Sequence, residues 1–293
     1  MPRKIGGGKY LGYSDAIMGL GNSVHLFNGQ TYRPLDIRTR VNGIDIDLCS
    51  GRYFDHMDTS TVLALEAAQD DLRRIPRCGG AYRRFLRDPF DLRKRSAGLG
   101  VNTLTVRRGG RGSGFYLHRR DGMWVVEAPD VLHVVPAGEF APSSDGPHIR
   151  DADCSLWRNI MREYAEEFLD MEEFYGKSGE SLDFANRSPF RELDEAYRSG
   201  LISVHVLGVG LDPLDWKPEL LTVCVIEADV FDRIFARLAS KGAEGVIIVG
   251  ERGAGIPFDR PTVETYLNNR ELLAAGDACL RLAWRHRDFL GIG

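Results

Sequence analysis

The chain has no apolar run that approaches the ~18 residues needed for a membrane-spanning helix, although 43% of its 293 residues are hydrophobic. Its first residues, Met1 to Lys4, lead into glycines and not into the apolar segment of a secretory signal peptide. Both absences predict a cytoplasmic protein without a membrane segment. The length suits one large domain or two modest ones, and the composition is typical of globular proteins.

Cysteine is scarce and scattered, with five residues at positions 49, 78, 154, 224 and 279 and no Cys-x-x-Cys pair. This pattern argues against a zinc site and against a disulfide framework, and it agrees with a reducing compartment. Two catalytic signatures are also missing. Gly6-Gly7-Gly8-Lys9 lacks the spacing of a phosphate-binding P-loop, and no Gly-x-Ser-x-Gly elbow indicates a serine hydrolase.

The net charge is only −4, but charge is unevenly distributed along the chain. Residues 73–120 contain 14 Arg or Lys and two acids, whereas residues 151–195 contain 13 acids and five basic residues. A basic segment that faces an acidic one suits a phosphate ester held on a metal ion. Mutual attraction between two halves of the fold would explain the pattern equally well. Nucleic acid is disfavoured as a partner because few aromatic residues interleave the basic ones.

Hydrophobic periodicity predicts strands and helices in mixed order. Residues 1–20 are glycine-rich and are expected to form an irregular arm, and residues 136–147 are expected to form a loop. The order of elements predicts an α+β fold with a sheet between helices. We expect an N-terminal extension or small α+β subdomain at 1–100 and a second domain at 101–293. The expected strands are 24–27, 44–48, 101–106, 115–118, 124–127, 131–135, 202–207, 220–226 and 245–249, and the main expected helices are 58–74, 154–169, 231–238 and 272–284.

Three carboxylates gather in the sequence Arg162-Glu163-Tyr164-Ala165-Glu166-Glu167, at positions i, i+3 and i+4 of a predicted amphipathic helix. Residues three and four apart share a helix face. Like charges at i, i+4 cost roughly 0.2–0.5 kcal/mol unless something compensates them. A hard cation such as Mg²⁺ would compensate, because it prefers oxygen ligands. The alternative is a solvated acidic face on which Arg162 is the local counter-ion.

The same hexapeptide resembles half of the sequence box of Nudix hydrolases, which reads Arg-Glu, an apolar residue, any residue, then Glu-Glu. Upstream, Leu117–Asp121 resembles the basic hairpin strand of the family, and Pro136-Ala137-Gly138 resembles a weakened form of its turn. The resemblance covers residues 101–290 and implies a Nudix-like α/β/α sandwich with a mixed sheet.

The Nudix box is incomplete in this chain. Gly138 lies further upstream of Arg162 than the corresponding glycine of the family, Cys154 stands in place of a glutamate, and Leu169 stands in place of a glycine. Only the metal-binding half of the box is therefore retained.

A second resemblance lies towards the C-terminus. The segments 208–214, 230–232 and 283–287 are similar to the C-terminal, Nudix-like module of some actinobacterial helix-turn-helix regulators. The first 100 residues show no convincing helix-turn-helix. A stand-alone relative of that module, in specialised metabolism, fits this pattern.

The Nudix resemblance implies metal-assisted hydrolysis of a nucleoside diphosphate derivative or a related phosphorylated metabolite, with Mg²⁺ or Mn²⁺ as the cofactor. Glu163, Glu166 and Glu167 would bind the metal, or two would bind it while Glu163 or Glu167 acts in catalysis. Arg162 would orient these carboxylates. Further candidates, each with a surface role as the alternative, are Glu251 as a general base, Glu139 as a ligand, and Arg107, Arg119 and Arg120 as phosphate contacts.

Two other functions remain open at this point. The incomplete box and the long loop at 139–153 favour a Nudix-like module that senses a ligand or binds a partner without hydrolysis. A cleft repurposed for other chemistry is the third interpretation, because function resides in sites and not in folds. Residues 1–100 have three candidate roles: capping the cleft, forming the surface of a homodimer, or packing as an extra layer.

Overall fold

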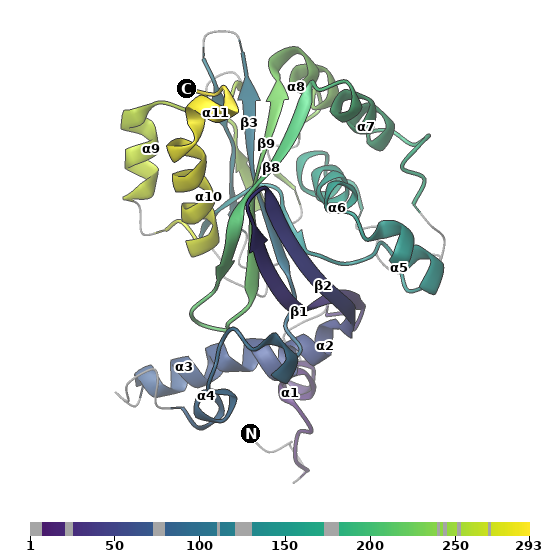
Figure 1. The fold of residues 1–293 in the computed structure, drawn as a ribbon, viewed down its shortest axis with the longest axis vertical. Helices are drawn as coiled ribbons and strands as arrows, with labels where there is room; N and C mark the ends of the chain where they lie inside the picture. The colour runs from purple at the N-terminus through teal and green to yellow at the C-terminus, as the bar shows by residue number, and fades with distance from the viewer. Residues whose placement is uncertain are drawn as a thin grey trace.

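A mixed β-sheet lies between two layers of helices (Figure 1). The structure is a computed structural model. It describes residues 8–20, 26–72, 80–109, 112–120, 131–172, 182–238, 241–242, 245–250, 253–268 and 271–293. Among these residues, no helix combines the length and the apolar character that crossing a membrane requires.

The central sheet has the strand order β12-β4-β3-β9-β8, with β7 also paired to β3. β3 and β9 run parallel, and the other neighbours are antiparallel. The strands are β3 (Gly100–Arg108), β4 (Gly114–Phe115), β7 (Ala137–Glu139), β8 (Ile202–Leu211), β9 (Pro218–Glu227) and β12 (Ile256–Pro257).

The sheet separates two hydrophobic cores because the side chains of a strand alternate between its faces. On β9, Cys224 and Ile226 belong to one core, whereas Val223 and Val225 belong to the other. All four side chains are buried, as expected for a central strand covered on both sides. This arrangement confirms the predicted α+β fold with a mixed sheet between helices.

Helices from different parts of the chain cover the two faces (Figure 1). One layer contains α6, α7 and α8, and the other contains α9, α10 and α11. Their bounds are α6 (Leu156–Glu163), α7 (Phe190–Arg198), α8 (Ala228–Ile234), α9 (Arg260–Leu267), α10 (Ala274–Arg285) and α11 (Arg287–Leu290). A short helix, α5 (Pro147–Asp153), precedes α6.

A second, smaller sheet has the order β10-β11-β5-β6. It places His118 directly opposite His133 on neighbouring antiparallel strands, and both histidines are buried. The strands are β5 (Leu117–Arg120), β6 (Leu132–Val134), β10 (Lys241–Gly242) and β11 (Gly245–Ile248).

The N-terminal region adds a long two-stranded hairpin and a group of helices at one end of the molecule (Figure 1). The Tyr32 N–H of the hairpin donates to the Phe140 carbonyl at 3.0 Å, and Tyr32 joins the core beneath α6. The prediction of an irregular arm at 1–20 was wrong for residues 13–19, because they form α1. The elements are α1 (Tyr13–Gly19), β1 (Gln30–Arg40), β2 (Gly43–Arg52), α2 (Tyr53–His56), a π-helical turn (Met57–Thr61), α3 (Val62–Leu72) and α4 (Ala81–Leu86).

Two arginines of the N-terminal region, Arg83 on α4 and Arg95 further along the chain, contact the loop between β8 and β9. The guanidinium groups of Arg83 and Arg95 lie 5.1 and 5.7 Å from the ring centre of Trp216, within cation–π distance. Arg83 also donates to the Leu63 carbonyl at 3.1 Å and to the Pro213 carbonyl at 3.3 Å.

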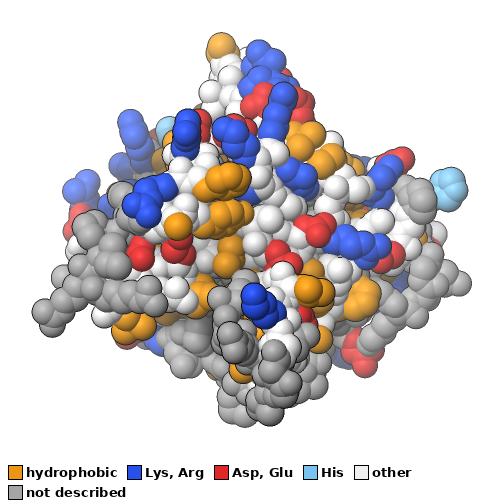
Figure 2. Space-filling view, turned by 90° about the horizontal axis from the view of Figure 1, so that it is seen from below, with side chains coloured by type: hydrophobic (Ala, Val, Ile, Leu, Met, Phe, Trp, Pro, Cys, Tyr) orange, Lys and Arg blue, Asp and Glu red, His pale blue; other side chains and the backbone are white. Residues whose placement is uncertain are grey.

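Figure 2 shows basic and acidic side chains interspersed on the face seen from this end. On this face the charges are mixed and do not form a field of one sign.

Candidate functional site

The carboxylates lie on α6 and on the π-helical turn that continues it, Tyr164–Phe168. Ser155 begins the helix, because its side chain accepts a hydrogen bond from the Arg158 N–H at 3.4 Å and so satisfies one free N–H group. The predicted helix is confirmed. Its last turn is a π-turn, which is wider than an α-turn and often occurs at functional sites. The simple i, i+4 stacking expected for Glu163 and Glu167 is therefore altered.

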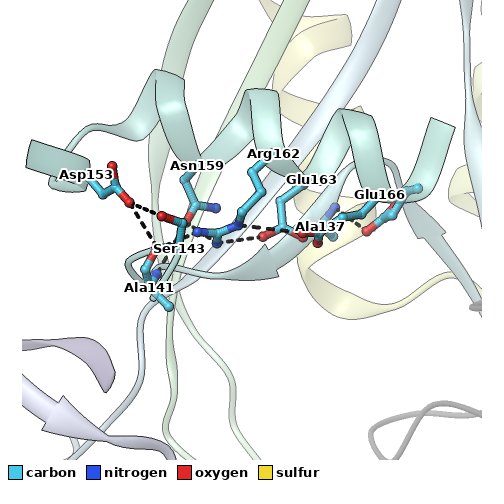
Figure 3. Close-up of polar contacts among 9 residues, drawn as sticks. Ala137, Ala141, Ser143, Asp153, Asn159, Arg162, Glu163 and Glu166 are labelled. Atoms are coloured by element: carbon cyan, nitrogen blue, oxygen red, sulfur yellow. Dashed lines mark hydrogen bonds and ion pairs between the residues drawn. The ribbon is translucent and has the colours of Figure 1, made fainter. Parts of the chain in front are cut away.

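Arg162 is buried beneath this helix and connects it to the loop that follows β7 (Figure 3). Its guanidinium donates to the Ala141 carbonyl at 2.9 Å, to Asn159 Oδ1 at 3.2 Å and to Glu163 Oε1 at 3.1 Å, and its Nε lies 3.9 Å from Glu166 Oε1. Burial lowers the pKa of Arg162, but the carboxylates of Glu163 and Glu166 outweigh it and hold the pKa above its usual value. Arg162 therefore stays charged and orients both glutamates.

Glu163 rests against a glycine of β7. A Cβ atom added at Gly138 would lie 2.4 Å from Glu163 Oε2, so the missing side chain makes room for the carboxylate. The side chain of Glu163 is only 13% exposed. The loop expected at 136–147 was wrong for residues 137–139, which form β7 and pair with β3. The weak sequence similarity at Pro136-Ala137-Gly138 nevertheless marks the segment that contacts the carboxylate helix.

Glu167 is the most buried of the three glutamates, with a side chain that is 4% exposed. Its Oε1 accepts a hydrogen bond from the Ala137 N–H at 3.1 Å, and its Oε2 lies 3.8 Å from His118 Nδ1. Burial of a carboxylate is costly unless hydrogen bonds and opposite charges compensate it. Glu167 thus connects β7 to β5 and has a fixed orientation.

The three glutamates share partners in pairs. Glu163 and Glu166 both contact Arg162, and Glu163 and Glu167 contact adjacent residues of β7. In the described part of the chain, no group of three or more His, Cys, Asp or Glu side chains is close enough to hold a metal ion. Mg²⁺ commonly uses one or two carboxylates and completes its shell with water and substrate phosphates. The donor chemistry of this site fits such a cation.

Two predicted phosphate contacts are engaged in ion pairs. Arg107 makes two hydrogen bonds to Asp232, at 2.8 and 2.6 Å, and these bonds raise the pKa of Arg107 against the effect of burial. Arg119 donates to Glu271 Oε2 at 3.0 Å, and both side chains are about half exposed. Both arginines are therefore balanced by acids from distant parts of the chain.

The remaining candidates lie elsewhere or outside the described residues. Glu139 is next to Gly138 on β7, but its Oε2 lies 3.6 Å from Lys217 Nζ, and successive strand residues point to opposite faces. The backbone of Arg120 belongs to β5, whereas its side chain is outside the described part. Glu251 also lies outside the described residues. The roles of Arg120 and Glu251 stay predictions.

Three supporting residues were missed from the sequence. Asn159 Oδ1 accepts the Ala141 N–H at 3.3 Å, and Asp153 Oδ2 accepts the Ser143 N–H at 3.0 Å as well as the Ser143 hydroxyl (Figure 3). These contacts tie residues 140–144 to α5 and α6, and they position the carbonyl that binds Arg162. No sequence signal marks them, because each pair is separated by ten or more residues and meets only in the folded chain.

No known protein family matches the sequence, and no curated protein matches it. Among solved structures, the chain is similar to a Nudix hydrolase from Alicyclobacillus acidocaldarius at 14% identity and a TM-score of 0.34, over 64% of this chain and 90% of that one. It is also similar to a MutT/Nudix family protein from Listeria innocua at 14% identity and a TM-score of 0.34, over 66% of this chain and 96% of that one. Similarity at this level assigns neither a family nor an activity.

Proposed function

We propose that the chain is a hydrolase that depends on Mg²⁺ or Mn²⁺ and cleaves a nucleoside diphosphate derivative or a related phosphorylated metabolite. The observation that carries the proposal is the arrangement of Glu163, Glu166 and Glu167. Their side chains are at most 13% exposed and are oriented by a buried arginine and by the backbone of β7. Hard oxygen donors held in this way favour a hard divalent cation.

Each residue of the site has a distinct part in this proposal. Glu163 and Glu166 bind the cation, and Arg162 holds their carboxylates in place. When bound, the cation polarises a phosphoryl oxygen and acidifies water. We assign the base to Glu167, because the Ala137 N–H fixes its Oε1 and so orients the carboxylate for proton transfer.

The test is incubation of the purified protein with MgCl₂ or MnCl₂ and a pooled panel of nucleoside diphosphate derivatives, with products identified by mass spectrometry. The Glu166→Gln/Glu167→Gln double variant should lose at least about 100-fold of the turnover, in line with loss of acid–base catalysis. Glu264→Gln is the matched control, because Glu264 is 59% exposed on α9. Folded wild-type protein that gives no metal-dependent product, or a double variant with an unchanged rate, would contradict the proposal.

A non-hydrolytic ligand-binding module is the second candidate. The ion pairs of Arg107 with Asp232 and of Arg119 with Glu271 favour it. These two arginines were the predicted phosphate contacts, and their guanidinium groups are already engaged with carboxylates. Calorimetric titration with the same nucleotides separates the two functions. Saturable binding without product over hours, equal in the wild type and in the double variant, would support the binding module.

A further inference from the structure

A pocket of about 720 Å³ lies between the β1–β2 hairpin, β8 and the C-terminal helix α11. Its lining comes from segments within 41–48, 204–207 and 286–290, together with residues that include Leu156 at the start of α6. Protein interiors are close-packed and contain few voids larger than a water molecule. Sites for small molecules typically measure about 300–1,000 Å³. The size of this space is therefore that of a ligand site.

The hairpin presents an apolar face to the pocket. Ile44, Ile46 and Leu48 alternate along β2 and line the pocket. The intervening Asp45 and Asp47 are on the opposite face, as the two-residue period of a strand requires. They pair with Arg40 and Arg38, each at 2.7 Å. This alternation makes the hairpin an amphipathic cover for the edge strand β8.

Among the residues that the structure describes, no Asp, Glu, Lys or Arg lines the pocket, although 27% of the chain is charged. The polar groups of the lining include His205, whose Nε2 lies 3.2 Å from Ser203 Oγ. Burial lowers the pKa of His205, and the charge of Arg108 lowers it further. The imidazole is consequently neutral at pH 7, and it can give or take a hydrogen bond without carrying charge.

Apolar side chains are also exposed at the mouth of the pocket, beside the polar residues Asn42 and His286. Val41, Val206 and Phe289 are 100%, 43% and 79% exposed, although each is a large hydrophobic residue. The Phe289 ring lies edge-on to His205, with 5.7 Å between the ring centres. Exposed apolar side chains that converge on a hollow indicate a binding surface and not a random scatter.

We propose that this pocket binds an uncharged, largely apolar small molecule, oriented by a hydrogen bond to His205. A phosphorylated ligand is disfavoured, because its charges would lose water without gaining a counter-ion from the lining. The site is separate from the carboxylates. Leu156 lines the pocket seven residues before Glu163, which is about 10 Å along the helix axis. The inference does not depend on the proposed hydrolysis.

The experiment uses two fluorescent probes that share the same rings. N-phenyl-1-naphthylamine is uncharged, and its 8-sulfonate analogue carries one negative charge. The wild-type protein is titrated with each probe at pH 8. The uncharged probe should bind saturably and at least about tenfold more tightly than the sulfonate, because the described lining contains no Lys or Arg. Absence of saturable binding, or equal affinity for both probes, would overturn the proposal.

Two arginine substitutions on strands locate the binding. Val206→Arg places a charge in the pocket, and Val246→Arg places the same charge on β11, at a residue that is also 43% exposed. Val206→Arg should weaken the uncharged probe about tenfold or more, whereas Val246→Arg should bind like the wild type. Ile44→Arg on the hairpin serves as a second pocket variant, and thermal unfolding identifies the variants that fold. Pocket variants that fold and bind the probe with wild-type affinity would overturn the assignment. A wild-type dimer that excludes the probe and dissociates in Val206→Arg would overturn it as well, by assigning the surface to a second copy.

Discussion

Three glutamates and Arg162 are buried around the last turns of α6, whereas Leu156 at its first turn lines a pocket whose described residues include no Asp, Glu, Lys or Arg. The charged end depends on fixed partners, since each buried carboxylate or guanidinium needs hydrogen bonds to stay buried. The apolar end depends on surface burial, which is not directional. Loss of one partner should therefore disrupt the first region far more than the second.

Removal of Arg162 is the severest test of this contrast. Arg162→Met should lower the free energy of unfolding by about 3–5 kcal/mol, because it leaves the buried carboxylates of Glu163 and Glu166 without their guanidinium. Urea denaturation at pH 7 measures the effect. Arg260→Met is the control, because Arg260 is 71% exposed and lies 3.9 Å from Glu264, so its loss should cost less than about 1 kcal/mol. Equal losses in the two variants would show that the buried network contributes little.

Gly138→Ala should change the orientation of the Glu163 carboxylate, and with it the affinity for Mn²⁺, while it leaves the stability of the protein nearly unchanged. The new Cβ would lie 2.4 Å from Glu163 Oε2, and the flexible glutamate side chain can swing away. We expect a change in stability below about 1 kcal/mol. Mn²⁺ affinity should fall about tenfold, as when a contact that orients a ligand is lost.

Calorimetric Mn²⁺ titration of Gly138→Ala provides the measurement, with Gly208→Ala as its control. No atom outside its own neighbourhood lies within 4 Å of a Cβ built at Gly208. Unchanged Mn²⁺ affinity in Gly138→Ala would remove Glu163 from the ligands.

The sequence predicted the parts of this comparison that depend on local periodicity. The amphipathic pattern indicates α6, alternation indicates β3, and an apolar run indicates the buried strand β9. These signals are local, because helix and strand periods need only neighbouring residues. The carboxylate helix was therefore located correctly, whereas its contact with Gly138 was found only in the structure.

The features that the sequence did not predict depend on contacts between distant residues. Arg107 and Asp232 are 125 positions apart, and no local pattern pairs them. The pocket is built from segments that lie far apart in the sequence and meet only in the tertiary structure. The π-turn at 164–168 and the strand at 137–139 likewise follow from packing against β7 and β3, which overrides local turn and helix preferences.

The pocket should tolerate truncation better than the closed core. Ile46 is half-buried and faces unfilled space, so Ile46→Ala should lower the free energy of unfolding by about 1 kcal/mol. Leu104→Ala is the comparison, because Leu104 is 0% exposed on β3 and such deletions cost about 2–5 kcal/mol. Thermal and urea unfolding of both variants gives the ratio. A loss at Ile46 equal to that at Leu104 would indicate that the hairpin is a full part of the core.

The smallest expected effect is at the pair formed by Arg107 and Asp232. Hydrogen bonds from Arg107, followed by its charge, hold the pKa of Asp232 below its usual value, against the opposing effect of burial. A carboxylate with a lowered pKa in the folded state stabilises the protein above its unfolded pKa of about 3.9, and this contribution is lost as pH falls through the lower folded value. Because the Asp232 side chain is 55% exposed, the contribution should stay below about 1 kcal/mol.

Asp232→Asn tests the sign of this effect. Relative to the wild type, the variant should be less stable at pH 6, and the difference should shrink between about pH 4 and pH 2. Urea unfolding across that range provides the measurement. A difference that grows as pH falls would contradict the assignment, because it would require the folded state to raise the pKa of Asp232. A difference of several kcal/mol at pH 6 would contradict the contrast between exposed and buried charges. The exposed pair would then contribute as much to the free energy of unfolding as the buried contacts of Arg162.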